Sequence, residues 1–112
     1  MTGVQTCALP ICNSAAAALG APGNVRINEW MASPFSGDGW FELYNLDPLP
    51  VSLGGCYLSD DPSLAGQGKF QIAPLSFIPG KGWINWDADG HPSNGRNHVN
   101  FQLNASGEPI LF

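Results

Sequence analysis

The chain has 112 residues, a formal net charge of −5 at pH 7, 44% hydrophobic residues and only 12% charged residues. This length allows a single domain with one core, and the composition is too apolar for a disordered segment. The four cationic side chains (Arg26, Lys69, Lys81 and Arg96) are scattered along the chain, which disfavours nucleic-acid binding, and no apolar run is long enough to span a membrane.

The first 24 residues carry no strand pattern. Residues 1–12 resemble the translation of a sequencing-library adapter, so we expect them to be an artefact outside the natural gene product. They lack the positively charged start of a secretory signal, and Pro10 interrupts their short apolar run. Two of the three cysteines, Cys7 and Cys12, therefore carry no information about redox compartment. Residues 13–24 are rich in Ala, Gly and Pro and are predicted to be a linker.

Residues 25–112 are predicted to form the folded domain, beginning with two strands. Residues 25–31 alternate in polarity, with Val25 and Ile27 on the inner face. Residues 40–45, Trp-Phe-Glu-Leu-Tyr-Asn, form the clearest strand of the chain. Phe41 and Leu43 fall on one face of it, and its other side chains up to position 44 fall on the opposite face (Trp40, Glu42 and Tyr44). The Phe41 face therefore requires a second apolar layer.

Shorter strands separated by turn residues are predicted to supply that layer (50–53, 56–58, 69–72, 83–86, 98–103 and 109–112). Trp83 and Trp86 are expected to share a face opposite Ile84, and Phe101 and Leu103 are expected to point inward. Residues 78–82 are predicted to be a turn and residues 87–97 a long polar loop. This strand spacing favours an all-β, immunoglobulin-like β-sandwich. Because the chain ends inside an apolar strand, we expect the domain to be truncated at its C-terminus.

Several stretches, in order, resemble the lamin-tail domain family in the form found in bacterial exported proteins. They are Ile-Asn-Glu at 27–29, Phe-Glu-Leu-Tyr-Asn at 41–45, Leu-Gly-Gly-Cys-Tyr-Leu-Ser-Asp at 53–60, Ile-Pro-Gly at 78–80, and His-Val-Asn-Phe-Gln-Leu at 98–103 before Ser-Gly-Glu at 106–108. Cys56 stands where the family usually has an aromatic residue, so the resemblance implies a cavity or local repacking there. The strand and turn that close the family's domain have no counterpart in this sequence.

The resemblance implies an immunoglobulin-like sandwich used as a non-catalytic interaction or accessory module. Its expected setting is a larger bacterial protein that is secreted or displayed at the cell surface, with other domains in the same parent chain. The expected partner is another protein or a cell-surface component. No cofactor, nucleic acid or membrane span is expected.

Asp87 and Asp89, before Gly90, are the candidate metal-binding residues. Alternating oxygen ligands before a tight glycine turn are typical of the start of a calcium loop. However, His91 occupies the place of the third oxygen ligand, and no further acidic residue occurs before Glu108. A solvated turn without a metal is therefore the preferred interpretation. His91 and His98 are too few and too far apart in sequence for a zinc site.

No catalytic residues are predicted. Ser93 and Ser106 lie in Gly- and Asn-rich turns without the strand-to-helix context of a hydrolase nucleophile. Glu29 and Glu42 resemble a general acid and base pair only in their residue type, and their positions in strands favour a structural role. A hydrolase fragment is therefore only the third alternative for function.

Aromatic side chains form the candidate surface for contacts: Trp40, Tyr44, Trp83 and Trp86. Most aromatic residues in a sandwich pack in the core or across strands, but some here must face outward, because Trp40 and Tyr44 oppose Phe41 and Leu43. An exposed aromatic platform suits a carbohydrate as well as a protein, so a carbohydrate- or calcium-dependent binding module is the second alternative. Asn104-Ala105-Ser106 matches the N-glycosylation sequon, which has meaning only in a eukaryotic secretory pathway.

Overall fold

The computed structural model describes residues 18–32, 38–107 and 109–112, so the predicted artefact at 1–12 lies outside the described residues. Its strands are β1 (Val25–Met31), β2 (Gly39–Asn45), β3 (Val51–Ser52), β4 (Tyr57–Leu58), β5 (Phe70–Gln71), β6 (Phe77–Ile78) and β7 (Trp83–Ala88). The described part has no α-helix, only 3₁₀ turns at Pro22–Asn24 and Pro92–Asn94, which is compatible with the predicted all-β class. No helix within these ranges is long and apolar enough to cross a bilayer.

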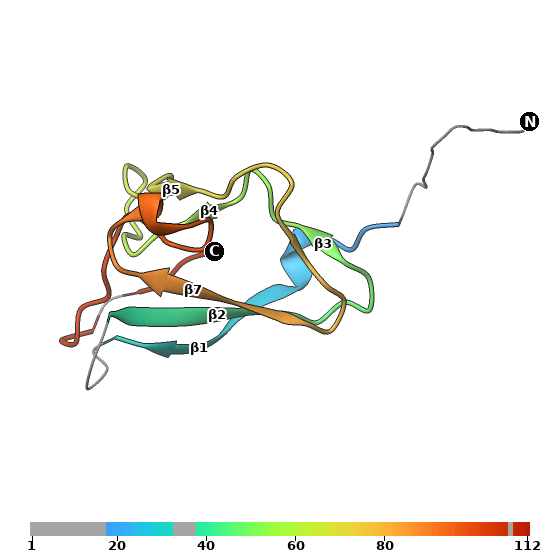
Figure 1. Cartoon of the computed structure of the whole chain (residues 1–112), viewed down its shortest axis with the longest axis horizontal. Helices are drawn as coiled ribbons and strands as arrows, with labels where there is room; N and C mark the ends of the chain where they lie inside the picture. The colour runs from blue at the N-terminus through green and yellow to red at the C-terminus, as the bar shows by residue number, and fades with distance from the viewer. Residues whose placement is uncertain (1–17, 33–37, 108) are drawn as a thin grey trace, which may run out of the picture.

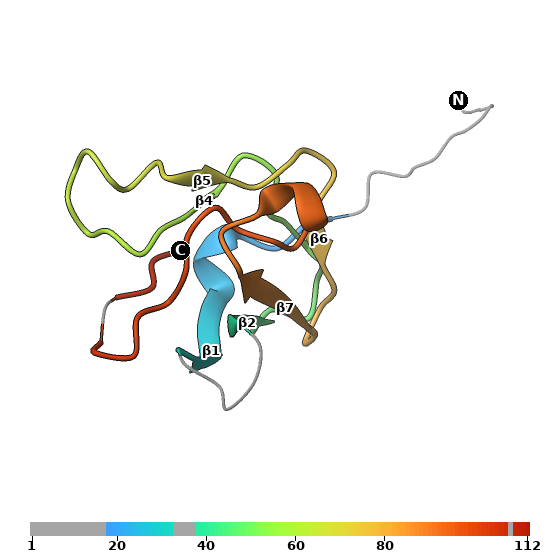
Figure 2. The ribbon, with the colours of Figure 1, turned by 60° about the vertical axis from the view of Figure 1, so that its left-hand side comes forward.

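The main structural element is an antiparallel sheet in the order β1-β2-β7. Two short antiparallel ladders, β3 with β6 and β4 with β5, are separate from this sheet, because no ladder joins them to its strands. Figures 1 and 2 show β1, β2 and β7 side by side, with β4 and β5 across the molecule from them. The core fills the space between these two layers.

Strand β2 provides the centre of the core through strict alternation. Phe41 and Leu43 are fully buried, whereas Trp40, Glu42 and Tyr44 are half-buried on the opposite face, which confirms the predicted split. Phe41 stacks on Phe101, with ring centroids 6.3 Å apart. The remaining buried apolar residues come from both layers and from the segment after residue 97 (Val25, Val51, Leu53, Leu58, Ile72, Ile78, Trp86, Ala88, Val99 and Leu103).

The predicted strand at 98–103 is wrong, although its inward residues are correctly predicted. Phe101 and Leu103 are buried as predicted, and Val99 is buried as well. The segment pairs with β7 and with Asp89 through isolated bridges, from His98 to Asp87 and from Gln102 to Asp89, and not through a ladder. The predicted strand at 109–112 is likewise reduced to one bridge, in which Leu111 exchanges backbone hydrogen bonds with Ser59. Alternation therefore indicated burial here, not membership of a ladder.

Two further predictions about the strands need correction. Residues 78–82 were expected to be only a turn, but Phe77 and Ile78 form β6 before that turn begins. Trp83 and Trp86 do not share a face: Trp83 is 62% exposed and Trp86 is 2% exposed. Residues three positions apart in a strand point to opposite sides, and Trp86 instead shares the inner face with half-buried Ile84.

Asn45 joins the turn after β2 to the turn before β7. Its side chain is fully buried and its Nδ2 donates to the carbonyl oxygens of Leu49 (2.9 Å) and Pro79 (3.1 Å). Its Oδ1 accepts from the amide of Asp47 at 2.9 Å. A short polar side chain at the end of the strand thus satisfies backbone groups of two loops at once.

The end of the predicted linker contacts the same region. Asn24 Nδ2 donates to the Asp47 carboxylate at 2.8 Å, and the Gly20 amide donates to the Pro50 carbonyl at 2.9 Å. Residues 18–24 therefore lead into β1 along the β2–β3 loop, and the 3₁₀ turn at Pro22–Asn24 sets the direction of entry.

Candidate functional site

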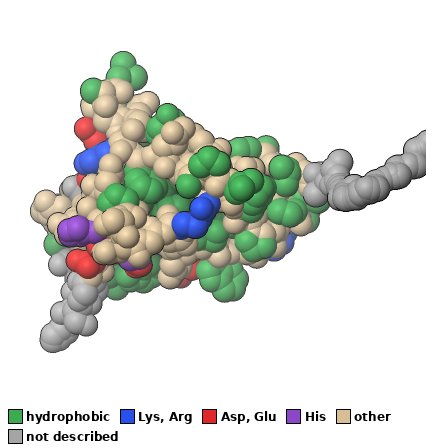
Figure 3. All heavy atoms as spheres, turned by 45° about the horizontal axis from the view of Figure 1, so that its top comes forward, with side chains coloured by type: hydrophobic (Ala, Val, Ile, Leu, Met, Phe, Trp, Pro, Cys, Tyr) green, Lys and Arg blue, Asp and Glu red, His purple; other side chains and the backbone are tan. Residues whose placement is uncertain are grey.

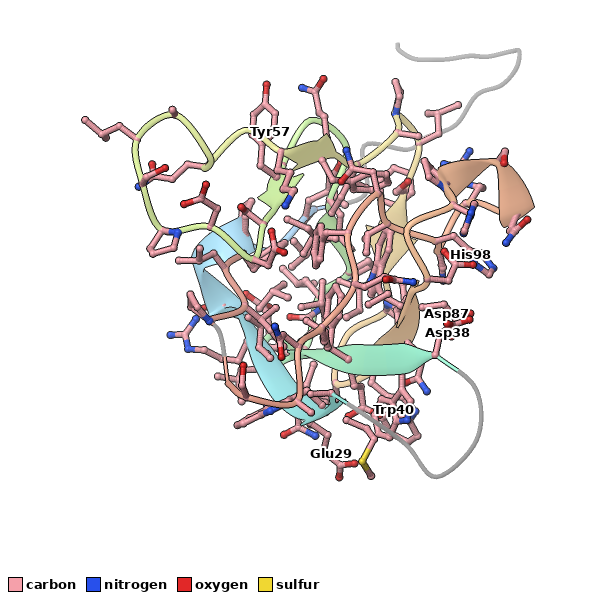
Figure 4. All side chains as sticks on the ribbon, turned by 90° about the vertical axis from the view of Figure 1, so that its left-hand side faces the viewer. Glu29, Asp38, Trp40, Tyr57, Asp87 and His98 are labelled. Carbon is pink, nitrogen blue, oxygen red and sulfur yellow. The ribbon has the colours of Figure 1, made fainter. Side chains whose placement is uncertain are left out.

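The outer face of the β1-β2-β7 sheet, on the side away from the core, has aromatic and acidic side chains in neighbouring rows. In one row Tyr44 lies between Arg26 and Trp83, and in the next Glu42 lies between Glu29 and Asn85. A third row carries Met31, Trp40 and Asp87. Figure 4 shows Glu29 and Trp40 on the side of β2 that faces away from the packed side chains of the core. We call the surface formed by these three rows the outer face.

A β-bulge brings Glu29 opposite Glu42. The register of β1 against β2 shifts between Ile27 and Glu29, so Asn28 is the extra residue of β1. Asn28 Nδ2 donates to Glu42 Oε1 at 2.7 Å. The bulge thereby places two carboxylates and an amide on one face, although Glu29 and Glu42 are thirteen residues apart in sequence.

A shallow pocket of about 330 Å³ lies over this part of the outer face and is lined by Asn28, Glu29, Glu42, Tyr44 and Trp83. It combines two aromatic rings with polar groups at one end, the usual composition of a site that orients a ligand. Of the predicted contact residues, Tyr44 and Trp83 line it, and Trp40 lies one row away. Trp86 was wrongly included in the predicted surface, because its indole is in the core and packs edge-on against Phe70.

All four Lys and Arg side chains bond to groups away from the two glutamates. Arg26 donates back to the carbonyl oxygens of Gly23 and Val25. The other three bind elsewhere: Lys69 to Asp60 (2.7 Å), Lys81 to the Leu46 carbonyl (2.7 Å) and Arg96 to the Pro74 carbonyl (2.9 Å). Within the described ranges, Glu29 and Glu42 therefore form no ion pair. Like charges directly opposite each other across strands destabilise a sheet, so this arrangement is not explained by folding.

A second polar cluster forms where β7 ends. Asp89 Oδ2 accepts from Asn94 Nδ2 at 2.8 Å and lies 2.7 Å from His98 Nδ1, and Asp89 Oδ1 accepts from the His91 amide at 2.8 Å. An ionised carboxylate only accepts, so His98 carries a proton on Nδ1. His98 Nε2 faces Asp87 Oδ2 at 3.5 Å. Figure 3 shows imidazole side chains beside acidic ones at one end of the molecule, and Figure 4 labels Asp87 and His98 there.

The preferred interpretation of a solvated turn is therefore wrong for Asp89, which is 6% exposed. Burial by itself raises the pKa of Asp89, but the hydrogen bonds from Asn94, from the His91 amide and from His98 lower it more, to about 2. These bonds tie the end of β7 to the segment that carries the core residues Val99 and Phe101. Their evident role is to hold that segment in place where no ladder does.

The described residues offer neither a metal cage nor a nucleophile next to an imidazole. Asp87 and Asp89 belong to no group of three or more His, Cys, Asp or Glu side chains in the described ranges that could hold a metal ion. The Ser59 hydroxyl donates to the Gly66 carbonyl, and the Ser106 hydroxyl donates to Asn104. Ser93 is exposed in the 3₁₀ turn at Pro92–Asn94. Asn104 and Ser106 of the sequon lie in an exposed turn.

The pKa of Asp89 predicts an acid-labile domain. Because the carboxyl has a lower pKa in the folded state than its ordinary value near 4, the unfolded state binds more protons between about pH 4 and pH 2. The stabilisation from Asp89, about 2 kcal/mol at most, is therefore complete above pH 4 and lost as the pH falls to 2. Urea unfolding across this range should show a steeper loss for the wild type than for Asp89→Asn.

Asp61 is a second source of acid sensitivity, which the wild type and the Asp89→Asn variant share. Backbone and side-chain hydrogen bonds from Ser63 also lower the pKa of Asp61, so the Asp89→Asn variant keeps some acid sensitivity. The difference between the two curves isolates Asp89. Parallel curves from pH 5 to pH 2 would show that the Asp89 cluster contributes nothing to folding.

A second hollow, of about 640 Å³, is lined by Tyr57, Gln67, Gly68, Leu111 and Phe112. Its only titratable side chain is Tyr57, which Figure 4 shows on the opposite side of the molecule from Glu29 and Trp40. Gln67 Nε2 donates to the Pro62 carbonyl within its own loop. The outer face is the better candidate, because its pocket combines two aromatic rings with two side-chain carboxylates and an amide.

The chain matches no family model, and the comparisons with curated proteins and with solved structures give no match. The candidate site therefore depends on its own geometry. Tyr44 and Trp83 were predicted from the sequence as contact residues, whereas Asn28, Glu29 and Glu42 were not. The missing information was the bulge in β1, which alone brings the two glutamates opposite each other.

Proposed function

We propose that this chain is a lamin-tail-like, immunoglobulin-like β-sandwich that acts as a non-catalytic interaction module of an exported or cell-surface protein, and that the outer face is its binding surface. The observation that carries the proposal is the outer face itself. Trp83 remains 62% exposed at the first residue of β7, where it pairs with Tyr44, and it lies beside two carboxylates that no Lys or Arg of the described residues neutralises. A large exposed ring and an uncompensated like-charge pair both favour recognition over folding.

The packing around the motif stretches supports the lamin-tail resemblance. Phe41 and Leu43 form the centre of the core, and Asn45, which ends the same stretch, bonds two loops together. Leu53 and Leu58 are buried on either side of the turn at Gly54-Gly55, and Val99 and Phe101 complete the core. The stretches at 41–45, 53–60 and 98–103 thus each have a packing role that a sandwich with two layers requires.

The hydrogen bonding of the catalytic candidates supports a non-catalytic role. His98 Nδ1 bonds Asp89, as the histidine of a triad would, but its Nε2 faces Asp87 Oδ2 at 3.5 Å and not a hydroxyl. His91 uses Nδ1 to bond the Asp89 carbonyl oxygen. Of the two serine candidates, Ser106 donates its hydroxyl to Asn104, and Ser93 is exposed in the 3₁₀ turn at Pro92–Asn94. In the described part of the chain, no hydrogen bond joins either serine to an imidazole, as a hydrolytic triad requires.

Trp83→Thr separates binding from folding. Threonine suits an exposed strand position, so we expect this variant to change the free energy of unfolding by less than about 1 kcal/mol. The same variant should weaken binding to whichever probe the wild type binds in a calorimetric panel of a basic peptide, an acidic peptide, a neutral peptide and a neutral hexasaccharide. Tyr44→Thr is the companion variant, because Tyr44 lines the same pocket from β2.

Two outcomes would contradict the proposed function. Unfolding energies that fall by several kcal/mol in Trp83→Thr would mean that the ring is needed for packing. Cleavage of a peptide or of the hexasaccharide by the wild type, abolished in Glu29→Gln or Glu42→Gln, would show that the two carboxylates catalyse hydrolysis.

A further inference from the structure

We propose that the ligand group held on the outer face is a lysine or arginine side chain, presented by a basic segment of a partner protein. This inference rests on the proposed function and adds the chemistry of the partner. Its starting point is the row in which Glu29 and Glu42 lie opposite each other on β1 and β2. A cation placed between two carboxylates would turn an unfavourable pair into a favourable trio.

The described residues supply no cation for this row. Its net charge is −5, and all four Lys and Arg side chains have partners elsewhere. Arg26, the nearest in register, lies in the neighbouring row but its guanidinium bonds the carbonyl oxygens of Gly23 and Val25, in the turn before β1 and at its first residue. The charge complement must therefore come from outside the described chain.

The walls of the pocket suit a long cationic side chain. Trp83 and Tyr44 are cross-strand neighbours, and both line the same hollow as the glutamates. Aromatic faces attract ammonium and guanidinium groups and also cover the apolar stem behind the charge. Asn28 holds Glu42 through Oε1 at 2.7 Å, so this carboxylate is oriented before a ligand arrives. A pocket of about 330 Å³ is large enough for one such side chain.

A neutral sugar and a bare metal ion fit the pocket less well. A sugar would stack on Trp83 and Tyr44 but would leave two opposed carboxylates with no positive charge between them. Calcium takes six to eight oxygen ligands. The described residues here belong to no group of three His, Cys, Asp or Glu side chains able to hold a metal.

The test is isothermal titration calorimetry with a hexa-arginine peptide, and with hexa-citrulline as a neutral probe of the same shape. We expect the wild type to bind hexa-arginine and to bind hexa-citrulline at least about tenfold more weakly, the factor that corresponds to 1.4 kcal/mol. Glu42→Gln should weaken hexa-arginine binding about tenfold, the loss of one charge-assisted hydrogen bond. Trp83→Thr should weaken it about threefold or more, the loss of an exposed cation–π contact.

Asp38→Asn is the matched control, because it removes the same charge from another place. Asp38 is exposed and lies beside Asp87, just before the first residue of β2, four residues along the chain from Glu42 and beyond the third row of the outer face (Figure 4). We expect it to change the dissociation constant less than about twofold, since a distant surface charge is screened at physiological salt. Neither Glu42→Gln nor Asp38→Asn should lower the unfolding midpoint, and Glu42→Gln should raise it slightly by removing the repulsion from Glu29, so any lost binding does not reflect unfolding.

The outcomes separate this inference from the proposed function. If Glu42→Gln and Asp38→Asn weaken hexa-arginine binding equally, the peptide responds only to the net charge of the protein, and the inference is overturned. Binding of hexa-citrulline or of neutral cellohexaose that depends on Trp83, with hexa-arginine no better, would overturn the cationic partner and leave the binding face intact. If no probe binds in a manner that depends on Trp83, both proposals fail.

Discussion

Phe41→Ala is expected to lower the free energy of unfolding by about 3–5 kcal/mol, the usual cost of removing a fully buried phenylalanine. Phe41 is 0% exposed at the centre of β2, and its ring stacks on Phe101 from the segment that has no ladder of its own. The substitution thus leaves a cavity and also loosens the packing of residues 98–103. Urea unfolding monitored by tryptophan fluorescence measures the loss.

Phe77→Ala is the matched control for Phe41→Ala. The two side chains are chemically identical, but Phe77 is 46% exposed in the two-residue strand β6. Its loss should cost about 1 kcal/mol, as for most partly exposed positions. Similar losses for both variants would contradict the assignment of Phe41 to the core and of its face of β2 to the interior.

Asn45→Ala is expected to cost about 2–4 kcal/mol, from several net hydrogen bonds and from buried carbonyl groups left without a donor. The fully buried amide donates to Leu49 and Pro79 and accepts from the Asp47 amide, so its removal affects the loops on both sides of β2. Asn45→Asp should also destabilise the fold, because a carboxylate oxygen would then face those carbonyl oxygens.

Asn97→Ala provides the comparison for Asn45→Ala. Asn97 is exposed and its Nδ2 donates one hydrogen bond, to the Asn85 carbonyl at 3.1 Å. Its removal should cost about 0.5–1.5 kcal/mol. Equal losses at positions 45 and 97 would mean that the buried network around Asn45 is no more important than an ordinary surface bond.

The alternation in residues 40–45 was sufficient to predict the inner and outer sides of β2. Successive side chains of a strand must alternate, and Phe41 and Leu43 are indeed buried. The same rule, applied correctly, separates Trp83 from Trp86, so the expectation that they share a face was an avoidable error. Where the period of two is respected, local sequence is enough to assign faces.

Alternation did not distinguish a strand from an irregular buried segment. Val99 and Phe101 are buried as a strand would bury them, but the segment is held by the Asp89–His98 bond and by two isolated bridges. That bond depends on the chain folding back after the turn at Pro92–Asn94, which the sequence pattern of a polar loop does not specify. The alternation of apolar residues indicates which side chains are buried, whereas the formation of a ladder depends on a partner strand.

The candidate binding face was predictable only in part. Exposure of Trp83 and half-burial of Tyr44 follow from strand parity, but the approach of Glu29 to Glu42 follows from the bulge at Asn28. A shift of one residue in register would send Glu29 to the other side of β1. Register is a property of the assembled sheet, so the acidic half of the site required the structure.

The most direct test of the proposed binding face is a set of ¹H–¹⁵N spectra in which the indole N–H signals of Trp83 and Trp86 are followed during titration with the hexa-arginine peptide. Both residues belong to β7, but one is 62% exposed on the outer face and the other is 2% exposed in the core. We expect the Trp83 indole signal to shift in a saturable manner while the Trp86 signal stays in place. Saturable binding that moves Trp86 or distant backbone signals and leaves Trp83 unchanged would contradict this expectation.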